Sequence, residues 1–402
     1  MVRPGPRHRG PGRPGERDPA RPPGAGERRW TMPKVVISGY YGFDNWGDEA
    51  ILETAVAGLR NAVPGVEITV LSSRPEVTAV RHDIRAVKRT DPRRILREIH
   101  TCDMLISGGG SLLQDVTSSR SLWYYLAIIL AAVRRGKKVM LYANGIGPID
   151  RPLNRLITRW VLDQVSLITV RGPSSREFLA ELGVTRPRIV ETADTAFAVD
   201  PAPPASVAAI CREEGLPDLT KADRPPFVGI VVRPWRQTDR LGPAVARAAD
   251  YIAGKLGYGV VFLPVHRDLD LDAAQRVQGL MKHPSHLVRN FYAARETVAL
   301  LGHFRWVLSM RLHPLIFAAV GGVPGIGLVY DPKVDEFLAQ TGQVSVGPVE
   351  KAQTEDILLA INDVEADYDA RAARLKEAVA ELRRRARMNN ELAAELLTGR
   401  RP

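Results

Sequence analysis

Cysteine and aromatic side chains are scarce in this chain. The 402 residues include two cysteines, Cys102 and Cys211, and 6% aromatic residues. The cysteines are far apart and show no metal-type spacing, so neither a disulfide framework nor a zinc site is expected, and a reducing cytoplasm fits. No basic stripe is interleaved with aromatics, which argues against nucleic acid as a partner.

Long apolar runs are also lacking. The longest candidate, Leu122–Val133, is followed by Arg134 and Arg135 and is too short to span a bilayer, so we read it as a buried helix. The N-terminus has no apolar signal core, which makes secretion unexpected and a cytoplasmic location the prediction.

The formal net charge is +11, and part of it is concentrated at the N-terminus. Residues 1–30 contain eight arginines against three acidic residues and almost no large apolar side chain. We predict that residues 1–32 are a disordered Arg/Pro/Gly-rich extension; the alternative is that the natural chain starts at Met32. The remaining positive charge suits acidic small molecules or an anionic membrane surface.

From Lys34 onward, predicted strands and helices alternate, which is typical of parallel α/β sheets. The rhythm breaks at a Pro-rich segment, residues 199–226, and then restarts. We therefore predict two Rossmann-like domains in a glycosyltransferase-B-like arrangement, with the active site in the interdomain cleft. The predicted parts are an N-terminal domain (33–198), a linker (199–226), a C-terminal domain (227–350) and C-terminal helices (351–402).

The segment Trp306–Gly327 is the centre of the functional prediction. A short apolar strand, Trp306–Met310, is followed by an apolar helical run, Leu315–Val320. Between them lie Arg311 and His313, a cation and an imidazole at the carboxyl end of a strand, where open α/β sheets bind ligands. The alternative is a buried arginine held by carbonyl groups and a histidine that caps a helix.

Other cations follow predicted strands in the same way. Arg171 comes after Leu167–Val170, Arg233 after the strand that begins at Phe227, and Lys333 after Gly327–Tyr330. Because strand ends of this kind meet at a cleft, the pattern predicts a site for a small, highly anionic substrate.

Two glycine-containing loops follow strands in the first half. In residues 39–49 the glycines lack the Gly-x-Gly spacing of dinucleotide-binding loops, and the second strand does not end in an acidic residue, so a nicotinamide cofactor is disfavoured. The loop instead offers an aromatic and polar platform for a sugar, in which the candidates are Tyr41, Asn45, Asp48 and Glu49. Alternatively, the two acidic residues only stabilise a helix N-terminus.

Residues 107–115 form the second loop. Gly109 and Gly110 would let backbone N–H groups approach a sugar or an anion, and Asp115 could contact the acceptor. The alternative is a plain tight turn.

Three motifs in order give the chain a resemblance to a known family. The three motifs resemble those of the polysaccharide pyruvyl transferase family: Gly39–Phe43 with Asn45–Ile51, then Gly108–Leu112, then Ser309–His313 followed by Asp331–Lys333. The resemblance spans roughly residues 34–342 and is closest to the bacterial branch that pyruvylates cell-wall polymers for surface-layer anchoring. Departures from the family pattern are Pro314, Trp46 and the N-terminal extension.

The resemblance implies phosphoenolpyruvate as donor and an N-acetylmannosamine-type sugar on a lipid-linked saccharide as acceptor, joined as a pyruvate ketal. It matches Arg311, Leu312 and His313 to the donor-binding motif, and Arg171 and Lys333 to further basic positions. We expect Arg311 and Arg171 to clamp the donor, with Arg233 nearby, His313 to act as acid or base, and Lys333 to neutralise the phosphate. Asp48 or Asp115 could deprotonate the acceptor, and no metal or cofactor is expected.

Two other functions remain open at this stage. A nucleotide-sugar glycosyltransferase of the same architecture would need an acidic residue for the ribose, and Asp335 or Glu336 could serve. A non-enzymatic carbohydrate-binding module of the envelope is the second. Peripheral contact with the inner membrane through residues 383–387 is a further alternative, less favoured than a solvated helix face, and the oligomeric state is left open.

Overall fold

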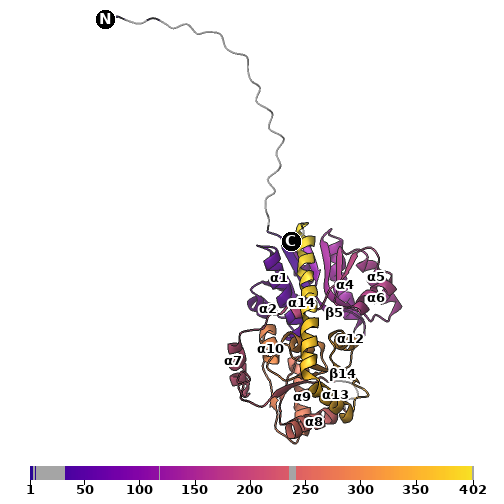
Figure 1. Ribbon diagram of the computed structural model, residues 1–402. Coiled ribbons are helices and arrows are strands. Elements are labelled where there is room, and N and C mark those ends of the chain that lie inside the picture. Colours follow the sequence, from indigo (N-terminus) through magenta and orange to yellow (C-terminus); the bar gives the residue numbers. More distant parts are fainter. Residues whose placement is uncertain (3–4, 6–31, 117, 235–240, 401–402) are drawn as a thin grey trace. The chain divides into compact units, whose positions relative to one another are not determined.

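A computed structural model describes residues 1–2, 5, 32–116, 118–234 and 241–400. The prediction for residues 1–32 therefore falls almost entirely outside the described residues. Residues 33–402 form one compact unit, which contains two parallel sheets (Figure 1). We call each sheet with its covering helices a lobe.

The first sheet has the strand order β3-β2-β1-β4-β6-β7-β8, and β5 pairs with β6. All its strand pairs are parallel. Its strands are β1 (Lys34–Tyr41), β2 (Glu67–Ser72), β3 (Arg85–Lys88), β4 (Met104–Ser107), β5 (Gly110–Leu113), β6 (Lys138–Ile146), β7 (Leu167–Val170) and β8 (Arg188–Glu191). Its helices are α1 (Trp46–Ala62), α2 (Pro75–His82), α3 (Pro92–Thr101), α4 (Ser119–Val133), α5 (Pro152–Leu162) and α6 (Pro173–Leu182).

The second sheet has the order β11-β10-β9-β12-β13-β14 and is also parallel throughout. A 3₁₀ turn η1 (Thr195–Ala198) and helix α7 (Pro204–Glu214) lead into it. Its strands are β9 (Phe227–Val231), β10 (Gly259–Phe262), β11 (His286–Leu287), β12 (Val307–Ser309), β13 (Gly325–Val329) and β14 (Val344–Pro348). Its helices are α8 (Leu241–Tyr251), the π-helical turn η2 (Ile252–Leu256), α9 (Arg267–Leu280), α10 (Ala294–Leu301), α11 (Leu312–Val320) and α12 (Pro332–Thr341).

In both sheets the strand order reverses next to the first strand of the lobe. The reversal lies between β1 and β4 in one sheet and between β9 and β12 in the other. Ligands of doubly wound folds bind outside the carboxyl ends of the strands at such points. The fold class predicted from the sequence is confirmed, and the candidate loops after β1, β4, β9 and β12 lie at these two positions.

Local chemistry fixes where several helices begin. Asp91 accepts a hydrogen bond from the Arg94 N–H at the start of α3, and Asp331 accepts one from the Lys333 N–H at the start of α12. Each helix has Pro at its first position, where the missing N–H costs nothing.

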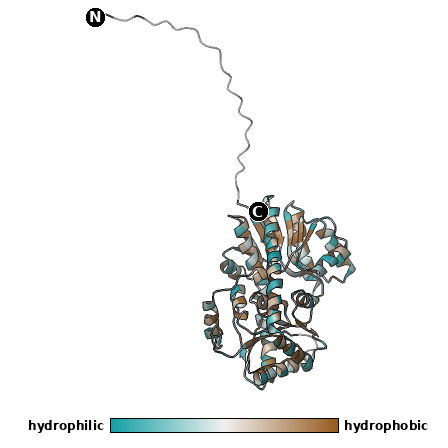
Figure 2. Cartoon of the chain, in the orientation of Figure 1, coloured by the Kyte–Doolittle hydropathy of each residue, from teal (hydrophilic) through white to brown (hydrophobic). Residues whose placement is uncertain are grey.

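Two helices close the chain, α13 (Thr354–Ala366) and the 31-residue α14 (Tyr368–Thr398). Helix α14 contacts α1 and β6 of the first lobe as well as α11 and α12 of the second (Figure 1). It carries a mixture of hydrophilic and hydrophobic residues (Figure 2), and its buried residues join the cores of both lobes. Within the described residues, no helix is both long and apolar enough to cross a membrane.

Four short elements were not predicted from the sequence: α2, β3, β5 and β14. Strand β1 also extends to Tyr41, with a register shift between Ser38 and Tyr41, whereas the sequence predicted its end at Ser38. Elements of four to eight residues carry too few periodic positions for the pattern to identify them.

Candidate active site

A cleft of about 660 Å³ lies between the carboxyl ends of the two sheets. Residues from both lobes line it, because the segments after β5, β6 and β7 face α11 and α12 across it. Among the lining residues are Ser111, Gln114, Gly145, Arg171, Ser174, Asp194, Arg233, Leu312, Tyr330, Lys333 and Glu336.

Arg171 directly follows β7 and projects into the first-lobe side of the cleft. Its Nη1 donates to Asp194 Oδ2 at 2.9 Å, and its Nη2 donates to Ser111 Oγ at 2.9 Å. A Cβ at Gly145 would lie 2.8 Å from the guanidinium, so glycine is needed there for the arginine to reach its position. Arg171 is thus held rigidly with one edge toward the cleft.

Asp194 links the two lobes electrostatically. It follows β8, is buried, and accepts the Ala196 N–H at the start of η1. Its Oδ2 lies 3.7 Å from His313 Nε2, which is an ion-pair distance rather than a hydrogen bond. Burial alone would raise the pKa of Asp194, but the neighbouring His313 and Arg171 hold that pKa well below its usual range.

His313 lies in the first turn of α11 and faces the first lobe. A Cβ at Gly47 would lie 2.0 Å from its Nδ1, so the imidazole packs against the bare backbone of the loop before α1. Its Nε2 is buried and has no hydrogen-bond partner among the described residues. The ring is therefore enclosed between the lobes, with Nε2 next to the Asp194 carboxylate, and it is not itself among the described residues that line the cleft.

Arg311 is positioned differently from the other cations. It is the N-cap residue of α11, and its Nη2 donates at 2.6 Å to Asp270, a fully buried carboxylate on α9. Its Nε is buried and has no hydrogen-bond partner among the described residues. Arg311 is not among the residues that line the cleft, although its neighbour Leu312 is.

Arg233 and Lys333 both line the cleft from the second lobe. The Arg233 guanidinium lies over the Tyr330 ring, 4.6 Å from its centroid. Lys333 Nζ lies 2.7 Å from Asp331 Oδ2, so the same aspartate caps α12 and holds the lysine. Sequence reasoning thus named three cations, Arg171, Arg233 and Lys333, that the fold brings to one cleft.

Asp48 lies in the first turn of α1, beside the glycine loop after β4. Its Oδ1 is 3.0 Å from the place where a Cβ at Gly110 would be, and Gly110 has φ +93°. Burial, and next the carboxylates of Glu49 and Asp194, raise the pKa of Asp48 to about 7. A carboxyl group with such a pKa can accept a proton at neutral pH.

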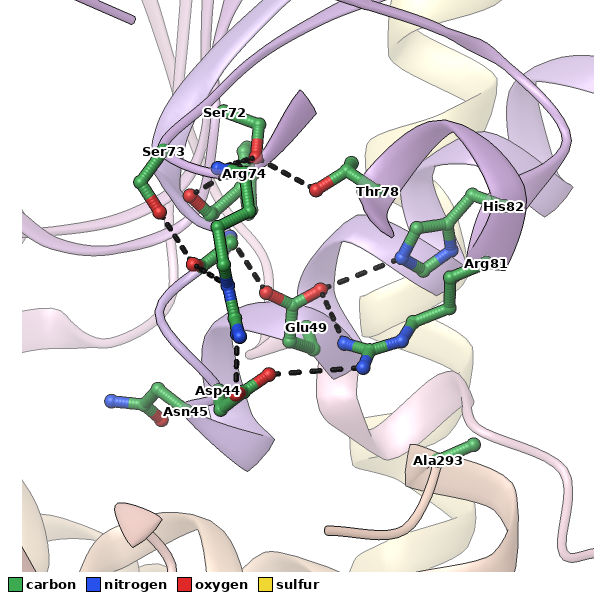
Figure 3. A network of polar contacts seen from close by, with 12 residues as sticks. Asp44, Asn45, Glu49, Ser72, Ser73, Arg74, Thr78, Arg81, His82 and Ala293 are labelled. Atoms are coloured by element: carbon green, nitrogen blue, oxygen red, sulfur yellow. Dashed lines mark hydrogen bonds and ion pairs between the residues drawn. The ribbon is translucent and has the colours of Figure 1, made fainter. Parts of the chain in front are cut away.

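Glu49 belongs to a network that holds the loop before α1 (Figure 3). It accepts the Gly42 N–H at 2.8 Å and lies 3.5 Å from both Arg81 and His82 on α2. Asp44 pairs with Arg74 and lies 3.7 Å from Arg81. The network fixes the loop that leads into α1, whose first turn carries Asp48.

Four other candidates are engaged by the fold, and we do not carry them into the proposed acceptor site. Tyr41 is fully buried, so its ring has no face for a sugar, and Asn45 accepts the Gly47 N–H as the cap of α1. Asp115 accepts the N–H groups of Asp150 and Arg151 and the Asn154 amide, whereas Gly109 packs against Ile51 and the Tyr142 carbonyl. Hydrogen bonds to its carboxylate lower the pKa of Asp115 despite its burial, which makes it a poor base.

Residues 45–332 match the family model described as polysaccharide pyruvyl transferase. The chain belongs to the polysaccharide pyruvyl transferase family. The resemblance stated from the three motifs is confirmed, and with it the prediction that this protein is an enzyme. Among curated proteins, the amylovoran biosynthesis protein AmsJ of Erwinia amylovora is 23% identical over 319 residues, which cover 73% of this chain and 72% of that protein.

Solved structures with the same fold are more distant in sequence. A putative UDP-N-acetylglucosamine 2-epimerase from Listeria monocytogenes is 13% identical, with a TM-score of 0.66 over 91% of this chain and 96% of that one. HepE of Anabaena, solved with UDP and glucose, is 12% identical, with a TM-score of 0.62 over 92% of this chain and 100% of that one. At such identities the likeness shows that this pyruvyl transferase family member shares the fold of those proteins, and no more.

Sequence reasoning named Asp48 but missed two carboxylates that hold the arginines of the candidate site, Asp194 and Asp270. Asp194 follows strand β8, so the strand-end rule that was applied to cations would have found it. Asp270 lies within a helix and shows no sequence signal of its role. Glu336 accepts a hydrogen bond from Ser174 across the cleft at 2.7 Å, and the sequence had named it only for a ribose contact in the glycosyltransferase alternative. Among the described residues, no group of three or more His, Cys, Asp or Glu side chains is arranged to hold a metal ion.

Proposed function

We propose that this enzyme transfers the enolpyruvyl group of phosphoenolpyruvate to two hydroxyls of one sugar and releases phosphate. The proposed acceptor is an amino sugar of the N-acetylmannosamine type on a lipid-linked precursor of a cell-wall polysaccharide. Membership of the family and the relative in amylovoran biosynthesis support a transferase of polysaccharide synthesis. The identity of donor and acceptor is our proposal.

The arrangement of cations carries the donor proposal. Arg171 from one lobe and Arg233 and Lys333 from the other line the same cleft. Phosphoenolpyruvate bears a carboxylate and a phosphate on a three-carbon unit, and guanidinium groups bind both types of oxyanion with paired N–H donors. Cations on both walls would let the donor bridge the lobes.

Arg311 has a supporting role in this scheme. Asp270 fixes one Nη, which leaves the Nε–H, without a partner among the described residues, as the donor toward an anion near the start of α11. The N–H groups at that helix N-terminus favour the same charge.

The reaction itself needs a proton donor and a proton acceptor. His313 would protonate C3 of the donor, and Asp194 would stabilise the imidazolium before transfer. One sugar hydroxyl then attacks C2, and its proton passes to Asp48. The second hydroxyl attacks C2 as the C2–O bond to phosphate breaks, and its proton passes to the imidazole of His313, which gave its own proton to C3. The electron pair of the broken bond leaves with the phosphate oxygen, which Lys333 neutralises and which takes up the proton held by Asp48.

Asp48 suits the role of base because its pKa is raised to about 7. At neutral pH a large fraction of the group is ionised, and the conjugate acid is weak enough for the carboxylate to take a proton from a hydroxyl that is attacking C2. Its place beside Gly110 would put the acceptor sugar over the glycine loop.

The test is a mass-shift assay with phosphoenolpyruvate and a panel of aryl amino sugars and lipid-linked saccharides. We expect a pyruvate ketal on one acceptor, stoichiometric phosphate release, and loss of at least about 100-fold in rate for Arg171→Met. Arg176→Met, an exposed arginine of the next helix, is the matched control. If UDP-sugars raise the melting temperature and phosphoenolpyruvate does not, the glycosyltransferase alternative replaces this proposal.

A further inference from the structure

An outer surface of the first lobe combines exposed apolar side chains with arginines. On α5, Leu153 is 60% exposed, Leu156 64% and Trp160 49%, and their spacing of three and four places them on one face. On α4, Trp123 is 48% exposed. Both tryptophans that are exposed among the described residues lie here, so the clustering is not the ordinary scatter of single apolar residues.

Contacts show that this surface is continuous. Trp123 Nε1 donates to Asn154 on α5 at 2.9 Å, and Arg134 at the end of α4 lies 6.0 Å from the Trp160 ring, so the two helices lie side by side (Figure 1). On the other side of α4, an apolar groove of about 370 Å³ extends the surface to α3. It is lined by Arg89, Thr90, Pro92, Ile95, Leu96, Ile99, Tyr124, Ala127, Ile128 and Ala131.

Positive charge is in excess on this surface. Residues 92–101, 118–138 and 151–162 contain nine arginines and two lysines, and Glu98 is their single acidic residue. Of the flanking acids, Asp91 lies 3.4 Å from Arg94 and Asp163 lies 3.9 Å from Arg159, and Asp150 is exposed. Glu181 on α6 lies 3.9 Å from Arg155, a weak partner at that distance.

The surface also borders the cleft. Val116, which is exposed just before α4, and Phe178 on α6 both line the cleft. Arg155 on α5 lies over the Phe178 ring at 5.2 Å. A molecule held against α5 therefore has a short path to the cations of the site.

We propose that the face formed by α3, α4 and α5 docks on an anionic phospholipid bilayer. Leu153, Leu156 and Trp160 would insert into the headgroup region, and the surrounding arginines would contact lipid phosphates. A bilayer beside the cleft would bring a lipid-linked acceptor close to the site. That part of the inference rests on the acceptor proposed above.

The arginine cluster near the C-terminus is a weaker membrane candidate. Arg383 pairs with Asp200, Arg384 with Glu381 at 2.7 Å, and Arg385 with Glu191 at 2.7 Å. Their charge is largely compensated within the molecule, and no exposed large apolar side chain lies beside them on α14.

Vesicle flotation of the full chain tests the docking without any substrate. We expect binding to phosphatidylcholine vesicles with 30% phosphatidylglycerol and little to pure phosphatidylcholine. The triple variant L153S/L156S/W160S should bind these anionic vesicles at least about tenfold more weakly. Its apolar side chains can no longer insert, whereas every cation remains. The control V80S/L359S removes exposed apolar residues of α2 and α13 and should bind as the original chain does.

The triple variant also separates this proposal from the others. It should retain its rate on a water-soluble acceptor and lose rate only on the acceptor in vesicles. Equal vesicle binding by the triple variant would overturn the proposal, because charge alone, including that of residues 1–32, would then explain binding. A lipid-free dimer that the triple variant abolishes would also overturn it, since a second copy would be the occupant of this face.

Discussion

At the scale of single residues, Asp194 is the carboxylate that contacts a candidate site residue in each lobe. It is buried, pairs with Arg171 at 2.9 Å, and lies 3.7 Å from His313 of the other lobe. The neighbouring imidazole and the Arg171 guanidinium hold the pKa of this carboxylate well below its usual range, so it remains ionised and does not compete for the proton that the imidazole must deliver.

Asp194→Asn should separate binding from chemistry. The amide oxygen can still cap η1, so the variant should fold. Loss of the negative charge leaves the cleft more positive, so KM for phosphoenolpyruvate should change less than about threefold, whereas kcat should fall about 100-fold because the imidazolium is no longer stabilised. Initial rates measure both quantities, with Asp200→Asn at the surface as control; an unchanged kcat would exclude the role assigned to Asp194.

Asp48→Asn should have opposite effects on activity and stability. The pKa of Asp48 in the folded chain is about 7 against an ordinary value of 3.8, so between about pH 4 and pH 7 the unfolded chain has lost this proton while the folded chain still holds it. The contribution of this group to stability therefore falls as pH rises through that window. Asparagine mimics the protonated acid, so the variant should melt about 2–6 °C higher at pH 8 and at the same temperature at pH 4.

The same substitution should remove most activity. The rate of the original enzyme should rise with pH up to about pH 7, as the Asp48 carboxylate forms, and the variant should lack this ascending limb. Thermal scans and rates at several pH values check both parts. A variant that keeps the ascending limb would show that another group is the base.

At the scale of elements, the predictions that succeeded depended on one rule about strand ends. Arg171, Arg233 and Lys333 each follow a strand in the sequence, and the fold brings all three to one cleft because parallel strands direct their carboxyl ends to the same edge. The rule fails for Tyr41, because β1 continues to this residue through a register shift. Its ring is therefore buried and does not face the cleft. Local patterns do not show where a strand bends.

Gly47 shows how the beginning of α1 positions a side chain of α11. Alanine in a helix is ordinarily favoured over glycine by about 1 kcal/mol, yet a Cβ here would lie 2.0 Å from His313 Nδ1. Gly47→Ala should therefore displace the imidazole and lower kcat by at least about tenfold. Gly279→Ala, at a helical site with open space around it, should leave the rate unchanged; equal rates for both variants would contradict the contact.

At the scale of the whole molecule, the contacts between lobes could not be predicted from the sequence. Asp194 and His313 are distant in the chain, and neither lies in a pattern that names its partner. The sequence gives each lobe its alternation of strands and helices, but the pairing of surfaces depends on side-chain shapes that no periodicity encodes. The same holds for Asp270, which meets Arg311 only in the folded second lobe.

Helix α14 is hydrogen-bonded to the segment that carries Asp194. Asn389 is fully buried, accepts the Thr192 hydroxyl at 3.0 Å and donates to the Ala193 carbonyl at 3.3 Å. Asn389→Ala should lower the unfolding free energy by about 1–3 kcal/mol, because it leaves buried polar groups unpaired. Denaturant unfolding measures the change, and Asn362→Ala, which loses an exposed bond to Tyr251, should cost less than about 1 kcal/mol.

The last turns of α14 also set the order in which the protein can be completed during synthesis. Leu392, Ala393 and Leu397 pack on the core that contains Val35 and Ile37 of the first strand. A nascent chain that has emerged only as far as the second lobe would therefore display an uncovered hydrocarbon face on the first. A chain that stops before residue 392 would therefore keep this apolar face exposed and should aggregate through it.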